Sequence, residues 1–162
     1  MDKILIVDGY SSVRELLAEE LAGDGKMVVA VGNPACIPDL LNTFEPDLVV
    51  LDVFMNGKMK WRVLHEIKKQ RPRLPVVIFT STYPDGDLRR HPIDAWVIKS
   101  FIFDELKQKI NEVLKKKTLC PSTPKNIMQE GTIGSNLGPL KTVQASGREP
   151  LRPLIGRFGS RC

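Results

Sequence analysis

Asp47-Leu48-Val49-Val50-Leu51-Asp52 is the segment whose pattern says most about the fold. Its four consecutive apolar residues predict a strand buried on both faces of a parallel sheet, because such strands lack the apolar–polar alternation of half-exposed ones. An ionised carboxylate is rarely buried without a partner, so Asp52 is expected where this strand emerges. Ligands of open α/β sheets bind at the carboxyl ends of the strands, which makes Asp52 the first candidate for chemistry.

Four more short apolar runs predict further strands, at residues 4–7, 27–31, 76–79 and 95–98. Segments with helical spacing lie between and after these runs, at residues 12–22, 38–44, 61–67 and 103–117, with at most a short helix near 87–90. Strands that alternate with helices predict an α/β fold of three layers, a doubly wound parallel sheet covered on both faces.

Two local signals predict where helices begin. Ser12 with Glu15 three residues later has the pattern of a capping box for the first helix. Pro38 is expected as the first residue of the second helix, because proline is tolerated there and not in a helix interior.

Composition is that of an ordinary soluble globular protein, with 162 residues, 42% hydrophobic and 27% charged. We expect no secretory signal peptide and no membrane span, since no apolar run approaches ~18 residues. Three widely spaced cysteines, Cys36, Cys120 and Cys162, indicate neither a disulfide framework nor a zinc site. A reducing cytoplasm is the simplest location.

Charge is distributed unevenly between two parts of the chain. Residues 1–117 carry 18 Lys and Arg against 17 Asp and Glu, whereas residues 118–162 carry 6 against 2. The second part is rich in Pro, Gly, Ser and Thr and has no helical or strand period, so we expect one domain over 1–117 followed by a low-complexity, disordered basic tail. A helix-turn-helix needs periodic helical segments, and none is predicted there, so no DNA-binding domain is expected.

Polar side chains stand at the ends of four predicted strands: Asp8, Asp52, Thr80 and Lys99. In a parallel sheet these ends share one edge. Two carboxylates, an ammonium and a hydroxyl could hold a phosphoryl group and Mg²⁺, which is usually bound by one or two carboxylates together with phosphate oxygens and waters. The alternative is that each residue merely ends its strand.

Residues 3–117 resemble the receiver domain of bacterial two-component response regulators, of the chemotaxis-regulator-like kind. The matching segments are residues 3–8 (KILIVD), 13–17 (VRELL), 46–52 (PDLVVLD) with Gly57, 75–80 (PVVIFT), and 96–99 (WVIK) with Phe101. The resemblance implies a flavodoxin-like fold with five strands in the order 2-1-3-4-5.

The resemblance also implies a function and a set of site residues. Asp52 would accept a phosphoryl group from a histidine kinase or a phosphotransfer protein. Asp8, Asp52 and the backbone carbonyl of Phe54 would hold Mg²⁺.

A conformational switch is implied as well. Thr80 would move toward the phosphoryl group, Lys99 would pair with it, and Trp96 would change rotamer. Beyond self-catalysed phosphotransfer and autodephosphorylation, no enzymatic activity is implied.

Several positions depart from the family pattern. Gly9 replaces the second of two adjacent acidic residues, Asn56 and Ser100 replace prolines, and the segment between Thr80 and Lys99 is short. The change at Gly9 leaves Asp8, Asp52 and Lys99 with a net charge of −1 instead of −2. We therefore expect weak Mg²⁺ binding.

Three functional hypotheses follow from these residues. The first is a single-domain response regulator that signals through phosphorylation-dependent contacts with an unknown protein target. The second is a pseudo-receiver, an interaction module that works without phosphorylation. The third, a flavin or nucleotide binder, is weakened by the lack of a glycine-rich phosphate loop after the first strand. Trp61 is expected to pack a helix, and His65 and His91 are expected to be plain surface residues.

Overall fold

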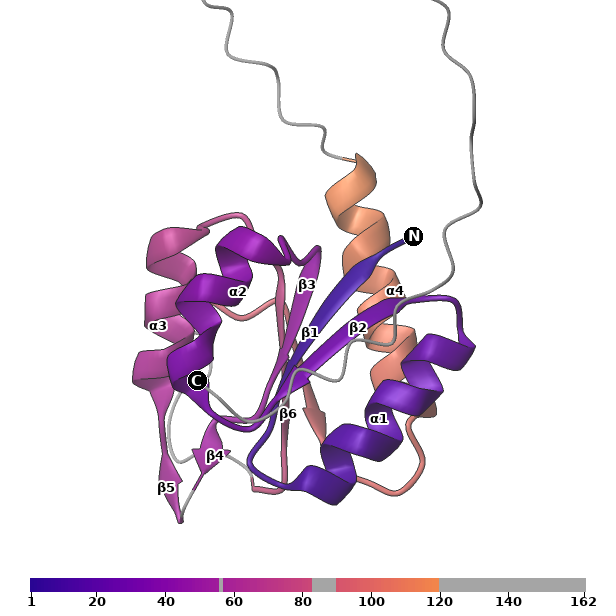
Figure 1. Cartoon of the computed structure of the whole chain (residues 1–162), viewed down its shortest axis with the longest axis horizontal. Helices are drawn as coiled ribbons and strands as arrows, with labels where there is room; N and C mark the ends of the chain where they lie inside the picture. Colours follow the sequence, from indigo (N-terminus) through magenta and orange to yellow (C-terminus); the bar gives the residue numbers. More distant parts are fainter. Residues whose placement is uncertain (56, 83–89, 120–162) are drawn as a thin grey trace, which may run out of the picture. The chain divides into compact units, whose positions relative to one another are not determined.

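A five-stranded parallel sheet forms the centre of the molecule (Figure 1). The computed structural model describes residues 1–55, 57–82 and 90–119. The strands of this sheet are β1 (Lys3–Val7), β2 (Met27–Val31), β3 (Leu48–Leu51), β6 (Val76–Thr80) and β7 (Ala95–Ile98). Their order is β2-β1-β3-β6-β7. Counted along the chain, this is the predicted order 2-1-3-4-5 of a flavodoxin-like fold.

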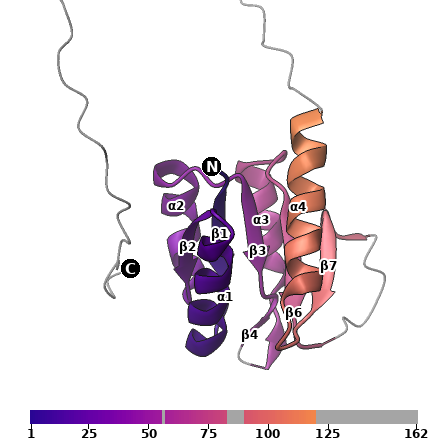
Figure 2. The ribbon, with the colours of Figure 1, turned by 90° about the vertical axis from the view of Figure 1, so that its right-hand side faces the viewer.

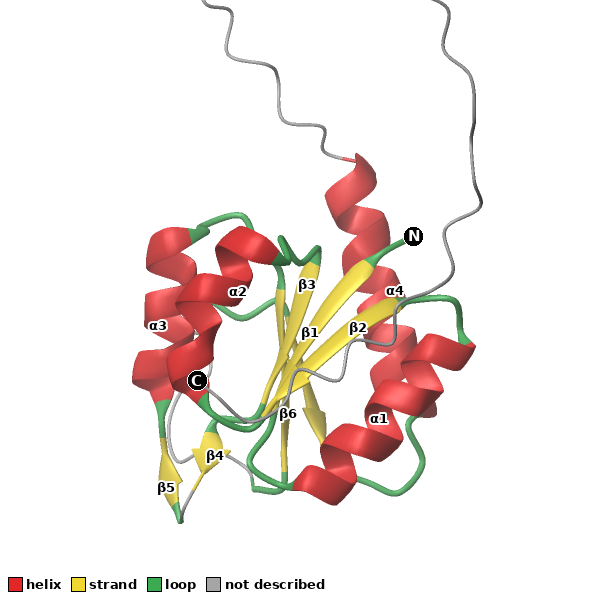
Figure 3. Ribbon diagram, viewed as in Figure 1, coloured by secondary structure: helices red, strands yellow, loops and turns green. Residues whose placement is uncertain are grey.

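Helices cover both faces of the sheet. They are α1 (Ser11–Gly23), α2 (Ile37–Thr43), α3 (Trp61–Gln70) and α4 (Asp104–Leu119), with a 3₁₀ turn, η1 (Pro34–Cys36), before α2. In Figures 1 and 2, α1 and α4 lie on one face, and α2 and α3 lie on the other. Figure 3 shows the three layers as red helices on either side of the yellow sheet.

Alternate residues of each strand enter two separate cores. Ile4 and Ile6 pack with α1 and α4, whereas Leu5 and Val7 pack with α2 and α3. All four of these side chains are buried. Burial on both faces explains the apolar runs, since full burial stabilises each such side chain by about 1.5–3 kcal/mol.

The start of α1 differs from the predicted capping box. The helix begins at Ser11 and is preceded by Tyr10, whose side chain makes no capping hydrogen bond. The backbone of Tyr10 is held instead, because its N–H donates to Asp8 Oδ1 at 2.9 Å. This hydrogen bond holds the residue just before α1. The helix therefore begins before Ser12, the residue that would cap it in the predicted capping box.

The second helix is short, as the prolines predict. Asn33 Oδ1 accepts a hydrogen bond from the Ala35 N–H and caps η1. Helix α2 then begins at Ile37, one residue before the predicted Pro38, and has seven residues. Cys36 is buried beside it.

The loop after Asp52 contains a hairpin that was predicted only as a turn. Strands β4 (Phe54–Met55) and β5 (Lys58–Met59) pair antiparallel. Gly57 has a φ of 71°, a left-handed conformation that suits glycine. Asn56 and most of the short helix predicted near 87–90 lie outside the described residues.

No helix in the described part of the chain is both long and apolar enough to cross a membrane. Helix α4 continues to Leu119, two residues past the predicted end of the domain at Lys117, so the prediction of a disordered tail is wrong for Thr118 and Leu119, which are helical.

Candidate functional site

The four predicted polar residues meet at one edge of the sheet. Asp8 follows the last residue of β1, Asp52 follows the last residue of β3, Thr80 ends β6 and Lys99 follows β7. All four strands are parallel, so these positions lie at their carboxyl ends. The predicted convergence is therefore present in the structure.

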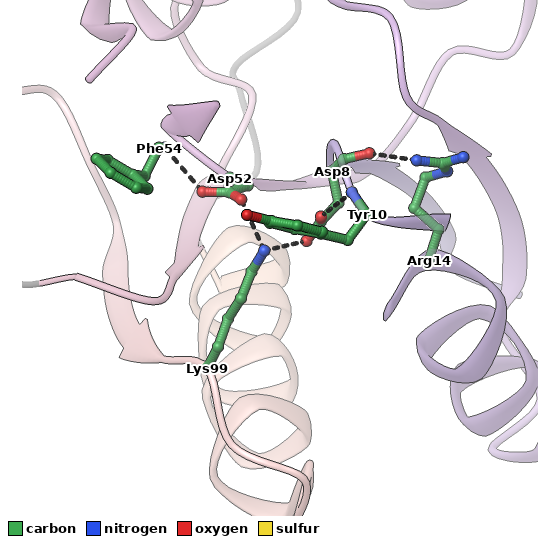
Figure 4. Close-up of polar contacts among 6 residues, drawn as sticks. All are labelled: Asp8, Tyr10, Arg14, Asp52, Phe54 and Lys99. Atoms are coloured by element: carbon green, nitrogen blue, oxygen red, sulfur yellow. Dashed lines mark hydrogen bonds and ion pairs between the residues drawn. The ribbon is translucent and has the colours of Figure 1, made fainter. Parts of the chain in front are cut away.

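Lys99 joins the two carboxylates (Figure 4). Its Nζ lies 2.6 Å from Asp8 Oδ2 and 2.6 Å from Asp52 Oδ2. Both aspartates are 2% exposed, and the Lys99 side chain is 12% exposed. Asp52 is thus buried at the end of its strand because it has a charged partner, as buried carboxylates require.

Backbone N–H groups satisfy the other carboxylate oxygens. Tyr10 N–H donates to Asp8 Oδ1 at 2.9 Å, and Phe54 N–H donates to Asp52 Oδ1 at 2.8 Å. Every carboxylate oxygen of the pair therefore has a hydrogen-bond donor. The three side chains carry a formal charge of −1, which leaves the pocket attractive to a further cation.

Thr80 contributes an unused hydroxyl. Its side chain is fully buried, and Oγ1 has no hydrogen-bond partner in the structure. Its backbone carbonyl accepts a hydrogen bond from the Lys99 N–H at 2.8 Å. A buried hydroxyl without a partner costs about 1–3 kcal/mol, so this group is available for a ligand at the same edge.

Tyr10 covers the ammonium from the solvent side. Its ring centroid lies 5.2 Å from Lys99 Nζ, within the range of a cation–π contact, and the residue is 58% exposed. In Figure 4 the ring extends across the pocket from Asp8 toward Lys99. This ring contact could not be predicted from the spacing of residues in the sequence.

Arg14 supports the loop that carries Asp8. Its Nη1 donates to the Asp8 carbonyl at 2.7 Å. A β-carbon built at Gly32 would lie only 2.7 Å from the same Nη1, so a larger residue there would displace the guanidinium from its present position. These supporting roles were not predicted, because they depend on the close approach of α1 to the end of β2.

Trp96 lies in a cluster of rings on the α3 side. Its ring centroid is 6.4 Å from that of Trp61, and its Nε1 is buried without a hydrogen-bond partner. Trp61 in turn stacks on His91, with centroids 3.8 Å apart and planes within 7°. Trp61 therefore packs its helix, as predicted.

The prediction of two plain surface histidines is wrong for His91. This residue is half-buried, and its ring also meets the edge of His65 at 5.6 Å between centroids. Burial lowers the pKa of His91 below its ordinary value of 6.5, and the neighbouring His65 lowers it further. The stack on Trp61 could not be predicted from the spacing of residues, because Trp61 and His91 are far apart in the sequence.

The pocket offers a small but suitable set of ligands for Mg²⁺. Asp8 and Asp52 present two carboxylates to one point, and a hard cation of this size accepts one or two carboxylates plus waters. No group of three or more His, Cys, Asp or Glu suited to a metal occurs in the described ranges. A β-carbon at Gly9 would meet nothing within 4 Å, so the position of the missing acid is open space.

Comparison with known proteins identifies the family. The sequence profile of the response regulator receiver domain matches residues 4–111. This chain belongs to that family. It therefore has the fold of the receiver domain found in two-component response regulators. A probable transcriptional regulator, ycf27 of Guillardia theta, is 30% identical over 121 residues, which cover 71% of this chain and 46% of that protein.

Two solved receiver structures are similar to this chain. The complex of the histidine kinase ThkA with the response regulator TrrA includes a chain with 34% identity and a TM-score of 0.63. TrrA from Thermotoga maritima with Mg²⁺ and BeF has 35% identity and a TM-score of 0.60. Each match covers 70% of this chain and 99% of the other. By contrast, this chain spans about half or less of the length of the curated relatives that it matches.

Proposed function

We propose that this receiver accepts a phosphoryl group on Asp52 and signals through a change in its protein contacts. The observation that carries the proposal is the environment of the Asp52 carboxylate. It is buried, it accepts the Phe54 N–H at 2.8 Å, and it pairs with Lys99 at 2.6 Å. A carboxylate held in place beside a cation is suited to act as a nucleophile toward phosphorus.

In the proposed reaction an Asp52 oxygen attacks the phosphorus of a phosphohistidine. The O–P bond of an aspartyl phosphate forms, the N–P bond breaks, and the imidazole nitrogen leaves with the electron pair. Lys99 would release one carboxylate and bind a phosphoryl oxygen as a point charge. Thr80, whose Oγ1 has no partner, would donate a hydrogen bond to another of these oxygens.

Mg²⁺ is the cofactor that fits this pocket. Asp8, Asp52 and the backbone carbonyl of Phe54 would hold it, and when bound it would neutralise charge on the phosphoryl oxygens. We propose that binding is weak, because Gly9 supplies no carboxylate. The structure of the similar chain TrrA in complex with Mg²⁺ and BeF supports Mg²⁺ as the cofactor.

The donor and the output of the signal are part of the proposal. The complex of TrrA with the kinase ThkA supports a histidine kinase, or a phosphotransfer protein, as donor. Phosphorylation would shift an equilibrium in which Thr80 and Trp96 change position, and self-catalysed loss of phosphate would reverse it. We propose a cytoplasmic regulator with a single domain over residues 1–117. The basic tail, residues 118–162, is not required for the acceptor chemistry.

A beryllofluoride titration tests the site without a covalent step. Amide spectra of the ¹⁵N-labelled full chain are recorded with Mg²⁺ and then with added beryllofluoride, which mimics a phosphoryl group on a carboxylate. We expect shifts at Phe54, Thr80 and Lys99, and no shifts in an Asp52→Asn variant. Unchanged spectra at saturating Mg²⁺ would contradict the proposal.

A second candidate function is an interaction module that works without phosphorylation. The observation in its favour is that Lys99 already pairs with both carboxylates in a pocket that lacks an acid at position 9. For this candidate the spectra would stay unchanged with beryllofluoride, and partner binding would be the same for Asp52→Asn and the parent chain.

A further inference from the structure

A groove lies between η1, α2 and the start of α3. It has a volume of about 850 Å³, within the range of sites that bury several side chains. Residues of the 3₁₀ turn η1 and of the first turn of α3 line opposite parts of it. We call it the α2–α3 groove.

The floor and walls of the groove are mainly apolar. Ile37, Leu41 and Ile67 form a buried floor, with exposed fractions between 1% and 4%. The walls include the half-buried residues Trp61 and Val63. An apolar channel between two helices is the kind of surface that accepts the apolar face of a third helix.

The groove itself carries Lys60 and Arg62 against Glu66, and an adjoining hollow adds further positive charge. A smaller hollow of about 390 Å³ shares Leu41 and Gln70 with the groove and extends it toward the end of α4. The charged residues that line the two hollows are Lys60, Arg62, Arg71, Arg73 and Lys117 against Glu45 and Glu66. Arg62 is 91% exposed at its side chain, and its contact with Glu66 is a loose 3.8 Å. A surface pair of this kind contributes little and leaves the arginine available.

The positive charge around the α2–α3 groove favours one of its three possible occupants. Residues 118–162 carry 6 Lys and Arg against 2 Asp and Glu, so this segment would be repelled by the rim. A second copy bound by a two-fold axis would bring the same basic residues against each other. A partner with apolar anchors and acidic flanks matches both the floor and the rim.

The groove is also connected to the acceptor site by a short path. Lys60, on the groove wall, donates its N–H to the Val53 carbonyl at 2.7 Å. Val53 follows Asp52 directly, and the Asp52 carboxylate holds the next N–H, that of Phe54. A partner in the groove would therefore contact a residue that is hydrogen-bonded to the segment directly after Asp52.

We propose that the α2–α3 groove binds an acidic amphipathic helix of a partner protein. The apolar side chains of that helix would enter between η1 and α3, and its carboxylates would face Lys60 and Arg62. This binding does not require phosphorylation of Asp52.

The test uses a synthetic helix of about fourteen residues, with leucines at i, i+3, i+4 and i+7 and glutamates elsewhere. Its binding to the unmodified full chain is measured by fluorescence anisotropy in EDTA. We expect the glutamate peptide to bind about tenfold or more tightly than a matched peptide with lysines. Equal affinities for the two peptides, or no binding at millimolar protein, would overturn the proposal.

Variants locate the binding surface. Val63→Asp places a charge on the groove wall, and Leu16→Asp places the same charge on α1, on the opposite face. Val63→Asp is expected to weaken binding about tenfold, and Leu16→Asp by less than about twofold. If Val63→Asp fails to fold by circular dichroism, the exposed Arg62→Glu, with Lys115→Glu as its matched control, gives the same comparison.

Equal effects of groove and control variants would refute the assignment. Groove-dependent binding to phosphatidylserine vesicles without binding to the glutamate peptide would also refute it, in favour of a membrane surface. The binding measurement uses unmodified protein without metal. A negative result would therefore refute the groove proposal and would leave the proposal of phosphorylation at Asp52 unaffected.

Discussion

At the scale of single residues, the site depends on one ammonium that serves two buried carboxylates. Lys99 lies 2.6 Å from both Asp8 and Asp52, and no other cationic side chain of the described segments is recorded in contact with their carboxylates. Removing one member of a buried ion pair leaves an uncompensated charge, which costs about 3–5 kcal/mol. The same arrangement explains why both aspartates can be 2% exposed.

Lys99→Met should therefore destabilise the fold in the absence of divalent cations. We expect the free energy of unfolding to fall by about 3 kcal/mol, because two carboxylates would remain buried without a counter-charge. Adding Asp52→Asn to the same chain should restore part of this loss, because one buried carboxylate instead of two would then lack a counter-charge. Urea unfolding in EDTA measures both effects, and an unchanged midpoint for Lys99→Met would show that the carboxylates do not depend on the ammonium.

Gly9→Asp should tighten Mg²⁺ binding by about tenfold or more. A carboxylate ~5 Å from Mg²⁺ has a gross attraction of roughly 6–7 kcal/mol at an effective dielectric constant of ~20, most of which desolvation offsets. A β-carbon at Gly9 meets nothing within 4 Å, so the substitution is sterically free. Isothermal titration with Mg²⁺ measures the affinity.

Gly23→Asp is the matched control for charge. A β-carbon at Gly23 also meets nothing within 4 Å, and this residue ends α1, away from the strand ends that carry the site. It should leave Mg²⁺ affinity within about twofold. Equal affinities for Gly9→Asp and Gly23→Asp would contradict our account of the weak site.

At the scale of elements, ring contacts join α3 to the segment before β7. Trp61 begins α3, and it stacks on His91 at 3.8 Å. The ring of His65, one turn further along α3, also contacts His91 in a T-shaped arrangement. A change at the β4–β5 hairpin, which leads directly into α3, can therefore reach the strand that carries Trp96 and Lys99.

The His91 contact should make stability depend on pH below about 6.5. Burial lowers the folded-state pKa of His91 below 6.5, so the unfolded chain binds more protons than the folded chain between the two values. The contribution of His91 to stability is full above about pH 6.5 and is lost as the pH falls toward the folded-state pKa.

The chain has two histidines, so NMR can follow each imidazole separately. We expect a titration midpoint for His91 below about 6.5, assigned by comparison with His91→Gln. The urea midpoint should fall less between pH 7.5 and pH 5.5 in His91→Gln than in the parent. A His91 midpoint at or above 6.5 would show that the ring is not desolvated by the stack.

At the scale of the whole molecule, the strands and the site could be predicted from sequence because both follow from local patterns. The run 48–51 is apolar on both faces, and the polar residue after it must lie at the strand end. The roles of Tyr10, Arg14 and Gly32 could not be predicted in this way. They depend on distances between elements far apart in the sequence, such as the 2.7 Å contact of Arg14 with the Asp8 carbonyl.

The described part of the chain should fold without the segment that follows it. Among the residues that the structure describes, both cores are complete by Leu114, and α4 ends at Leu119. A fragment of residues 1–119 is expected to unfold in one transition, with a midpoint within a few degrees of that of the full chain. Thermal unfolding followed by circular dichroism checks this, and a loss of cooperativity in the fragment would contradict the domain boundary.

The most direct test of the central claim is the intact mass of the full chain after incubation with acetyl phosphate and excess Mg²⁺. Our account predicts one added phosphoryl group in the parent chain and none in Asp52→Asn, because Asp52 is the nucleophile held between Lys99 and the Phe54 N–H. No adduct in the parent, or an equal adduct in Asp52→Asn, would contradict the assignment of Asp52 as the phosphoacceptor.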